Sequence, residues 1–334
     1  MTEQTKIAVL GAGSWGTALA LALSRNNHSV TLWGHRLAHC EKMQSESCNQ
    51  QYLAGFNFPQ NLTVEADLEQ IVKQHKTFLL VPPSHAFREL LRKLKQYGVA
   101  SDALLIWATK GFDKEGPVLL SDVVYQELGD GIQKAIVSGP SFSKEVAGNL
   151  PTAMTAAGDS NDIANYVAEL FLNEYMRVYT NPDFIGVQVG GAIKNVMAIA
   201  AGISDGLGYG ANSRAAIITR GLAEISRLGV ALGAQQESFQ GLAGMGDLVL
   251  TCTDDQSRNR RLGLGLGKGQ SLEQTMEQIG QEVEGYTSTP EVIRLANNHG
   301  VEMPICEQVY AVLYGGISAS EAVSVLLTRE LGNE

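Results

Sequence analysis

Short apolar runs recur through the first half of the chain, and each is followed by turn residues and then by a stretch with helical spacing. Apolar runs of this length that alternate with helices are typical of parallel strands buried on both faces. The pattern predicts a doubly wound α/β sheet whose parallel strands lie at Lys6–Leu10, Ser29–Trp33, Thr77–Val81, Ala103–Ala108, Ala135–Val137 and Thr152–Ala156.

Helical spacing occurs in both halves, but it dominates the second. In "PPSHAFRELLRKLK" Ser84 follows two prolines where a helix would begin, and Phe87 and Leu91 follow at helical intervals. After about Gly190 the segments are long and helical in period, with few strand candidates. We expect two domains, residues 1–189 with the sheet and residues 190–334 mainly helical, as suits a chain of 334 residues.

Composition narrows the class of partner. The formal net charge of −10 repels phosphate backbones, so we expect no nucleic acid partner. Apolar stretches such as Val196–Ala201 are far shorter than the roughly 20 residues that a membrane helix requires, so we expect no membrane insertion. Four cysteines are too sparse for a disulfide framework, and a cytoplasmic location fits best.

A glycine-rich turn opens the chain. "KIAVLGAGSWGTALALAL" places Gly11, Gly13 and Gly16 between the first apolar run and a helix-like stretch. In a G-x-G-x-x-G turn the first glycine permits the bend, the second lets a pyrophosphate approach the backbone, and the third lets helix and strand pack closely. The phosphates then lie at a helix N-terminus. This context predicts a Rossmann-type dinucleotide site.

The second apolar run ends in "VTLWGHR". Domains that bind NAD usually carry an acidic residue there, which binds the ribose 2′-hydroxyl. His35 and Arg36 instead offer neutral or positive groups, which suit the 2′-phosphate of NADPH. We expect NADPH as the cofactor, with NADH also accepted. The structural alternative is an exposed loop without a ligand.

One lysine interrupts an otherwise apolar helical stretch, "QVGGAIKNVMAIAAGISDGLGYG". Such a lysine either extends from the edge of a helix or lies in a partly dehydrated site, where its pKa falls and it can exchange protons. Lys194 is therefore the first catalytic candidate. Asn195 beside it either binds substrate or bridges helices within a bundle.

A second polar group lies in "GLAGMGDLVLTCTDDQSRNRRLG". Asp247 stands in an apolar, glycine-rich setting, where a carboxylate could orient Lys194. The donors of Ser257, Arg258 and Asn259 suit a phosphate group. Two further arginines, Arg260 and Arg261, are expected on a basic helix face that makes surface ion pairs.

Two stretches follow the fourth and fifth apolar runs, at the sheet edge where ligands of open α/β folds bind. "WATKGF" places Lys110 there. "SGPSF" adds Gly139, which permits close backbone approach, and Ser141, which we expect to cap the following helix.

Two apparent motifs carry no site. "GLGLGKGQS" lacks the residues of a phosphate loop and predicts a helix end. The group of His35, His39, Cys40 and Cys48 matches no usual zinc spacing, so we expect no metal.

The chain resembles the bacterial NAD(P)-dependent glycerol-3-phosphate dehydrogenase family over essentially its whole length. The resemblance rests on blocks in one order: "GAGSWGTALA", "WATKG", "SGPSF", "NPDFIGVQVGGAIKNV", "GISDGLGYGANSRAAIITRGLAE", "AGMGDLVLTCTDDQSRNRR" and "VEGY". It implies reversible reduction of dihydroxyacetone phosphate to sn-glycerol 3-phosphate, which feeds glycerophospholipid synthesis. It also implies a C-terminal domain like that of 6-phosphogluconate dehydrogenase and a homodimer.

By this resemblance Lys194 is the proton donor and acceptor. The substrate site would be lined by Lys110, Gly139, Ser141, Lys194, Asp247, Ser257, Arg258 and Asn259, to which the position of Asn195 beside Lys194 adds that residue. Together with the glycine turn and Arg36, cofactor contacts would come from Ser14, Trp15, His35, Lys110, Ser143, Arg258, Glu282 and Glu284. Two positions depart from the family's usual residues: Ser143, commonly alanine, and Glu282, commonly the first valine of the pair before Glu284.

Two other functional hypotheses compete with the one that the resemblance implies. A 3-hydroxyacid or 6-phosphogluconate-type dehydrogenase shares the two-domain plan, but such enzymes typically place asparagine four residues after the helix lysine, where this chain has Ala198. A redox-sensing NAD(P)-binding module without catalysis explains the glycine turn, but it leaves Lys110, Lys194, Asp247 and Arg258 without a role.

Overall fold

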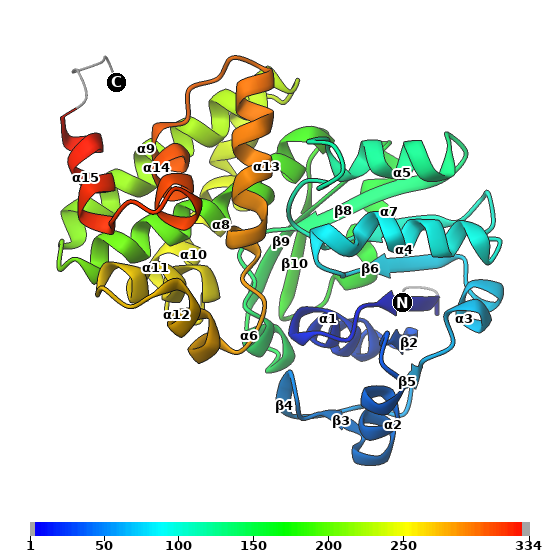
Figure 1. The fold of residues 1–334 in the computed structure, drawn as a ribbon. Helices are drawn as coiled ribbons and strands as arrows, with labels where there is room; N and C mark the ends of the chain where they lie inside the picture. The colour runs from blue at the N-terminus through cyan, green and yellow to red at the C-terminus, as the bar shows by residue number, and fades with distance from the viewer. Residues whose placement is uncertain (1–3, 329–334) are drawn as a thin grey trace. The chain divides into compact units, whose positions relative to one another are not determined.

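The structure is a computed structural model and describes residues 4–328. Its internal contacts divide the chain into two compact units. One runs up to Lys110 and resumes over Leu120–Val187, and the other holds Gly111–Leu119 and the residues from Gln188 onward. In Figure 1 the strands lie in the blue-to-green part of the chain, whereas the yellow-to-red part is helical.

The first unit is built on an eight-stranded sheet with the order β10-β9-β8-β7-β6-β1-β2-β5. From β5 to β8 this is the strand order of doubly wound dinucleotide-binding sheets, which confirms the predicted fold class. The strands are β1 (Lys6–Leu10), β2 (Ser29–Trp33), β5 (Leu62–Glu65), β6 (Thr77–Leu80), β7 (Leu104–Trp107), β8 (Gln133–Ser138), β9 (Thr152–Gly158) and β10 (Met176–Thr180).

One pairing in this sheet contradicts the prediction of parallel strands. β9 runs antiparallel to β8, with Ser138 opposite Thr155. The connection between them contains only the five-residue helix α6 (Ser143–Ala147). A helix of that length rises about 7.5 Å, which is too short to return the chain along a strand of about 20 Å. The next strand therefore starts at the edge where β8 ends.

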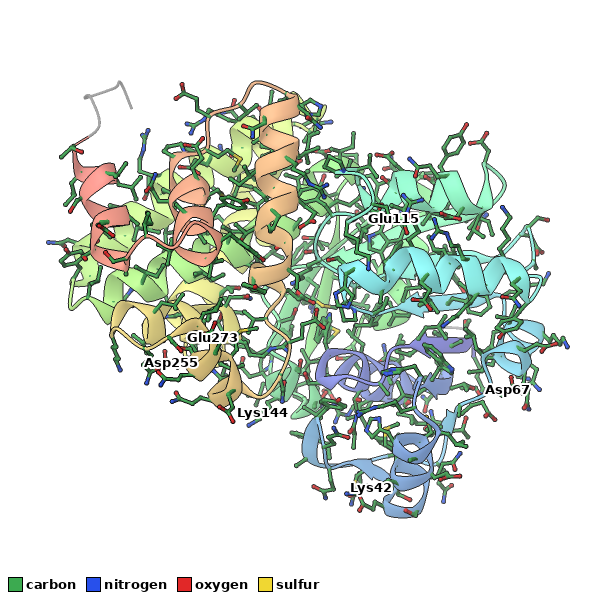
Figure 2. All side chains as sticks on the ribbon, in the orientation of Figure 1. Lys42, Asp67, Glu115, Lys144, Asp255 and Glu273 are labelled. Atoms are coloured by element: carbon green, nitrogen blue, oxygen red, sulfur yellow. The ribbon has the colours of Figure 1, made fainter. Side chains whose placement is uncertain are left out.

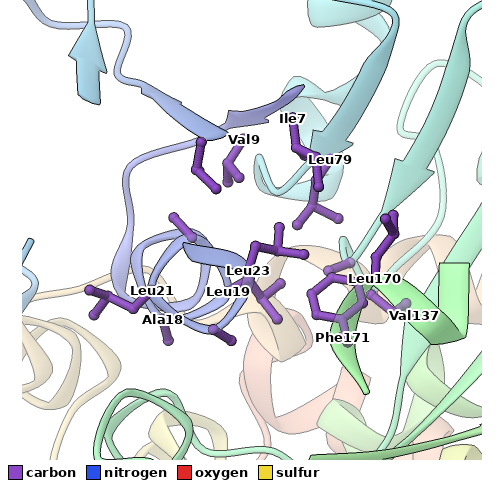
Figure 3. Packing of buried hydrophobic residues seen from close by; sticks show 14 of the residues in the cluster. Ile7, Val9, Ala18, Leu19, Leu21, Leu23, Leu79, Val137, Leu170 and Phe171 are labelled. Atoms are coloured by element: carbon purple, nitrogen blue, oxygen red, sulfur yellow. The ribbon is translucent and has the colours of Figure 1, made fainter. Parts of the chain in front are cut away.

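Both faces of the sheet are buried. On one face Val9, Leu79 and Val137 pack with Leu23 of α1 and Phe171 of α7 (Figure 3). The unit's helices are α1 (Ser14–Arg25), α2 (Leu37–Glu46), α3 (Leu68–Gln74), α4 (Ser84–Gln96), α5 (Leu120–Leu128), α6 and α7 (Asn161–Phe171). The start of α4 at Ser84 confirms the predicted helix. A small hairpin, β3 (Cys48–Asn49) and β4 (Leu53–Asn57), was not predicted.

On the other face the ring of Phe87, from α4, meets the edge of the Trp107 ring at 5.9 Å between centroids. Both side chains are fully buried. Continuous apolar runs in the sequence thus correspond to strands that are covered on both sides.

Within its described residues, the regular elements of the second unit are all helical. The long helix α8 (Phe184–Gly206) passes a length and hydropathy test for a membrane span, but 89% of its most apolar window is buried inside the protein. The other segments are α9 (Ala211–Ala231), the 3₁₀ turn η1 (Gln236–Gln240), the π-helical turn η2 (Leu242–Gly246), α10 (Asp247–Thr253), α11 (Arg258–Gly267), α12 (Leu272–Ile279), α13 (Glu284–Asn298), α14 (Pro304–Tyr314) and α15 (Ala319–Leu327).

Charged side chains such as those of Lys42, Asp67 and Glu273 are exposed (Figure 2). Glu224 is one of several buried carboxyl groups that are exceptions. Glu224 of α9 is 1% exposed and accepts hydrogen bonds from the backbone N–H groups of Ile305, at 2.8 Å, and Cys306, at 3.3 Å. It therefore caps the first turn of α14. Burial raises the pKa of Glu224 to about 7, and the two backbone hydrogen bonds only partly oppose this.

This buried carboxyl group should make the stability of the protein depend on pH. Because the pKa of Glu224 is higher in the folded state than its unfolded value near 4.5, its stabilising contribution is complete below about pH 4.5 and is lost as pH rises through about 7. The difference corresponds to about 3 kcal/mol. We expect the urea midpoint of the wild-type protein to fall between pH 5.5 and 8.5, and that of Glu224→Gln to fall much less. Equal slopes in the two proteins would contradict this assignment.

Candidate functional site

The three glycines of the first turn differ in their backbone conformation and surroundings. Gly11 has a φ of +131°, and a Cβ there would lie 2.7 Å from the carbonyl oxygen of Val81. At Gly16 a Cβ would lie 1.9 Å from the carbonyl oxygen of Gly11, whereas at Gly13 it would meet nothing within 4 Å. The turn thus bends at Gly11, closes against the helix at Gly16 and leaves open space at Gly13.

The N-terminus of α1 fits an anionic ligand. Its N-cap is Gly13, and among the described residues no side chain caps it, so the first backbone N–H groups can bind a phosphate. Ser14 and Trp15 are the first residues of this helix, and the indole nitrogen of Trp15 is buried without a hydrogen-bond partner within residues 4–328. Buried polar groups usually have a hydrogen-bond partner, and a dinucleotide cofactor bound at this open turn would supply an acceptor for the indole N–H.

His35 and Arg36 follow the end of β2, and both are exposed. The Arg36 guanidinium donates to the hydroxyl of Tyr52 at 2.8 Å and lies 5.9 Å from the centroid of its ring. The end of β2 therefore presents a positive group where a 2′-phosphate would lie.

Lys110 and Gly139 lie close together past the ends of β7 and β8. Lys110 Nζ donates to the carbonyl oxygen of Gly139 at 3.4 Å, and the Ser141 hydroxyl donates to the same oxygen at 2.9 Å. Gly139 has a φ of +134°, which requires glycine. The prediction that Ser141 caps the next helix is wrong, because α6 begins at Ser143 with Phe142 as its N-cap, and the hydroxyl is committed to the turn.

Lys194 and Asp247 form a buried ion pair within the helical unit. Lys194 Nζ lies 2.6 Å from Asp247 Oδ1, and the two side chains are 8% and 1% exposed. Nζ also donates to the hydroxyl of Thr251 at 2.6 Å, and that hydroxyl donates to the backbone carbonyl of Asp247 at 2.6 Å. Lys194 thus lies in a dehydrated site. The carboxylate of Asp247 orients it there, as expected.

Close backbone packing brings these two residues together. A Cβ at Gly190 would lie 2.6 Å from the carbonyl oxygen of Ala243, so α8 approaches η2 closely at this point. Lys194 and Asp247 each stand four residues further along, about one helical turn from the contact. A π-helical turn immediately before Asp247 is a feature that often accompanies functional sites.

Asn195 is part of a hydrogen-bond chain between helices. Its amide group donates to Glu284 Oε2 at 3.2 Å, and its carbonyl accepts from the amide group of Asn259 at 2.9 Å. The carbonyl of Asn259 accepts from the backbone N–H of Gly285 at 2.8 Å. The structure therefore shows the bridging role that was one of the two predicted for Asn195, and it places Glu284 in the same network. Glu282 lies just before α13 and is half-buried.

The arginines of α11 do not behave alike. Ser257 caps the helix by accepting from the backbone N–H of Arg260 at 3.2 Å, and half-buried Arg258 is the first helical residue. The prediction of surface ion pairs is wrong for Arg260, which is 7% exposed. Its guanidinium binds Asp205 at 2.6 Å and also pairs with Asp255. Arg260 therefore ties α11 to the C-terminal end of α8.

The cysteine near the ion pair of Lys194 and Asp247 has an unreactive thiol. Cys252 is fully buried, and burial raises the pKa of its thiol to about 12 despite the nearby charges of Lys194 and Arg260. Within residues 4–328 no group of three or more His, Cys, Asp or Glu side chains could hold a metal ion.

Glycines also bring α8 and α11 together. A Cβ at Gly202 would lie 2.1 Å from the carbonyl oxygen of Arg260, and one at Gly263 would lie 2.0 Å from that of Ile199. The helix end predicted for "GLGLGKGQS" is confirmed, because α11 ends at Gly267. Its glycines serve helix packing, and this contact lets Asn259 reach Asn195.

Within each unit the structure therefore assembles part of the predicted residue set. The first unit contains the glycine turn and the cluster of Lys110, Gly139 and Ser141. The second combines Lys194 with Asp247 and, through Asn195, with the start of α11. Thr251, which binds Lys194, was not predicted. Its position four residues after Asp247 on a helix is the signal that could have indicated it.

Comparisons of the sequence with known proteins find matches over nearly the whole chain. Residues 6–164 match the N-terminal profile of NAD-dependent glycerol-3-phosphate dehydrogenase, and residues 183–324 match its C-terminal profile. Glycerol-3-phosphate dehydrogenases [NAD(P)+] of Aeromonas salmonicida and Shewanella amazonensis are 51% and 53% identical to this chain over 335 residues, which covers 100% of the chain in both cases and 100% and 98% of the relatives.

A solved structure agrees with the sequence comparison. The crystal structure of glycerol-3-phosphate dehydrogenase from Coxiella burnetii is 45% identical and superposes with a TM-score of 0.94, over 98% of this chain and 99% of that one.

The contact between α8 and α11 is testable by adding one methyl group. Gly263→Ala would place a Cβ within 2.0 Å of a backbone oxygen that has no flexible side chain to yield. We expect the free energy of unfolding to fall by at least about 2 kcal/mol in urea denaturation. The control is Gly116→Ala, where a Cβ meets nothing within 4 Å. Equal stability of the two variants would contradict the packing argument.

Proposed function

The chain belongs to the NAD-dependent glycerol-3-phosphate dehydrogenase family, and we propose that its Lys194 donates the proton that completes reduction of dihydroxyacetone phosphate by NAD(P)H. The product is sn-glycerol 3-phosphate, and the reaction is reversible. The single observation that carries the role of Lys194 is its buried ammonium group, bound by Asp247 and Thr251.

The geometry around Lys194 suits proton transfer to a carbonyl oxygen. When bound, NAD(P)H would supply a hydride to the carbonyl carbon, so that negative charge would develop on the carbonyl oxygen. An ammonium group within hydrogen-bond reach stabilises that charge and then gives up one proton, leaving a hydroxyl group and a neutral amine. Asp247 and Thr251 both accept hydrogen bonds from the ammonium group and so fix its position. In the reverse reaction the amine takes the proton back.

The cofactor would be held by the turn of Gly11, Gly13 and Gly16 and by the first N–H groups of α1. Ser14 and Trp15 lie at that helix start, and His35 and Arg36 lie where the adenosine ribose would bind. The roles of Lys110, Ser143, Glu282 and Glu284 as further cofactor contacts rest on the family resemblance.

The substrate phosphate would be bound at the start of α11. Arg258 supplies a guanidinium, and the N-terminus of a ten-residue helix supplies backbone N–H groups and a favourable dipole. Lys110, Gly139, Ser141, Ser257 and Asn259 complete the proposed substrate contacts. Binding energy from the phosphate would then orient the distant ketone for reaction.

We also propose a cytoplasmic homodimer. All four cysteines are free and buried, which suits a reducing compartment. Helix α9 exposes Ala215 and Ala216, and Val230 near its end is 49% exposed. Apolar exposure along one helix is a surface that a second copy would cover. Light scattering should give twice the mass of one chain.

The proposed reaction is tested by a steady-state assay with dihydroxyacetone phosphate and either NADPH or NADH. We expect Lys194→Met to lower kcat by about 10²- to 10⁴-fold, since that is the usual contribution of a general acid. Binding of NADPH, measured by fluorescence, should be unchanged. Near-normal turnover in this variant would remove Lys194 from the mechanism. Activity of the wild-type enzyme toward 3-hydroxyacids alone would favour the competing dehydrogenase class.

The phosphate site is tested by comparing two substrates. Arg258→Ala should lower kcat/KM for dihydroxyacetone phosphate by about tenfold to a hundredfold, because a charge-assisted contact is lost. With NADPH saturating for both proteins, the same variant should reduce dihydroxyacetone, which has no phosphate, as slowly as the wild-type enzyme does. A similar loss with both substrates would show that Arg258 acts on something other than the phosphate.

A further inference from the structure

Asn49 is a buried amide whose hydrogen-bonding groups are all used. It is 0% exposed and lies in the short strand β3. Its amide nitrogen donates to the carbonyl oxygen of Ala12 at 3.0 Å and to the hydroxyl of Thr17 at 2.8 Å. Its carbonyl oxygen accepts from the backbone N–H of Tyr52 at 3.3 Å and lies 3.1 Å from His39 Nε2. Two donors and two acceptor sites are the full capacity of an asparagine side chain.

These partners fix the orientation of the amide. The Ala12 carbonyl can only accept and the Tyr52 backbone N–H can only donate, so the nitrogen of Asn49 must face Ala12 and its oxygen must face Tyr52. His39 must then present Nε2–H to that oxygen. Burial, the largest cause, lowers the pKa of His39, and the nearby positive charge of Arg36 acts in the same direction. A neutral ring with its proton on Nε2 agrees with the geometry.

The four partners come from two parts of the proposed cofactor site. Ala12 lies between Gly11 and Gly13, and Thr17 lies in the first turns of α1, so both belong to the segment that would receive the pyrophosphate. Tyr52 belongs to the segment after β3, and its hydroxyl accepts from Arg36. The His39 ring meets the Tyr52 ring edge-on at 5.3 Å between centroids. Asn49 therefore connects the glycine turn, through Tyr52, to the guanidinium of Arg36.

We propose that Asn49 is a positioning residue that holds Arg36 at a fixed place relative to the glycine turn, and that this placement sets how strongly the enzyme distinguishes NADPH from NADH. The inference rests on the proposed function. A dinucleotide has a fixed span from pyrophosphate to ribose 2′-position, so an arginine that binds the 2′-phosphate must be held at a matching distance. The exposed guanidinium has little else to hold it, because its side-chain partners are Tyr52 and Gln51.

The test is a binding measurement that does not depend on turnover. The Kd values of NADPH and NADH are measured by fluorescence for the wild-type enzyme, Asn49→Ala and Tyr52→Phe. We expect Tyr52→Phe to weaken NADPH by about tenfold, which corresponds to one lost charge-assisted contact, and to leave NADH within about twofold. Asn49→Ala should weaken both cofactors, since it also loosens the turn at Ala12, but NADPH by the larger factor.

Asn61→Ala is the matched control. Asn61 also bridges two backbone carbonyls, those of Ser24 and His28 at 2.8 Å each, but at the opposite end of α1 from the glycine turn. It should lower the melting temperature without changing the ratio of the two Kd values. An unchanged ratio in both Asn49→Ala and Tyr52→Phe would overturn the proposal, as would the same change in Asn61→Ala. Failure of the wild-type enzyme to bind either cofactor would instead overturn the proposed function.

If Asn49→Ala does not fold, Tyr52→Phe decides alone, because it removes one exposed hydroxyl and leaves the buried amide intact.

Discussion

The chemistry that we propose for this enzyme depends on one ammonium group kept away from water. Burying a charged amine is costly unless a partner compensates it, and Lys194 has Asp247 at 2.6 Å as that partner. A buried pair of this kind is weak evidence for stability, since an apolar pair of similar volume often stabilises as much. The pair is therefore better explained by what the ammonium group can do to a carbonyl oxygen than by what it adds to the fold.

Glycines, which have no side chain, repeatedly allow the close backbone contacts that position the polar groups of this fold. Gly190 lets α8 approach η2, and the contact between Gly202 and α11 brings Asn259 to Asn195. In the first unit Gly16 lets α1 close against the turn at Gly11. A methyl group at any of these positions would collide with a backbone atom, so the polar side chains depend on residues that make no polar contact themselves.

Much of this arrangement could be predicted from sequence. Continuous apolar runs gave the central strands, and the context of Gly11, Gly13 and Gly16 gave the dinucleotide turn, because both depend on local spacing. The antiparallel pairing of β9 could not be predicted in this way, since it depends on the length of α6. Arg260 was placed on the surface because its charge suggests water, whereas its partner Asp205 is 55 residues away in sequence. Thr251 and Asn49 were missed for a related reason: a hydroxyl or an amide has no distinctive pattern until its partners are known.

Chemical rescue tests the central claim most directly. In Lys194→Ala the substituted residue leaves a space of nearly the size of a small primary amine. We predict that single-turnover reduction of dihydroxyacetone phosphate by bound NADPH is nearly abolished in this variant and is restored in proportion to added ethylammonium, whereas ethanol, which has no ammonium group, restores nothing. A rate that equals the wild-type rate without any amine, or that responds equally to ethylammonium and ethanol, would contradict the assignment of the Lys194 ammonium as the proton donor.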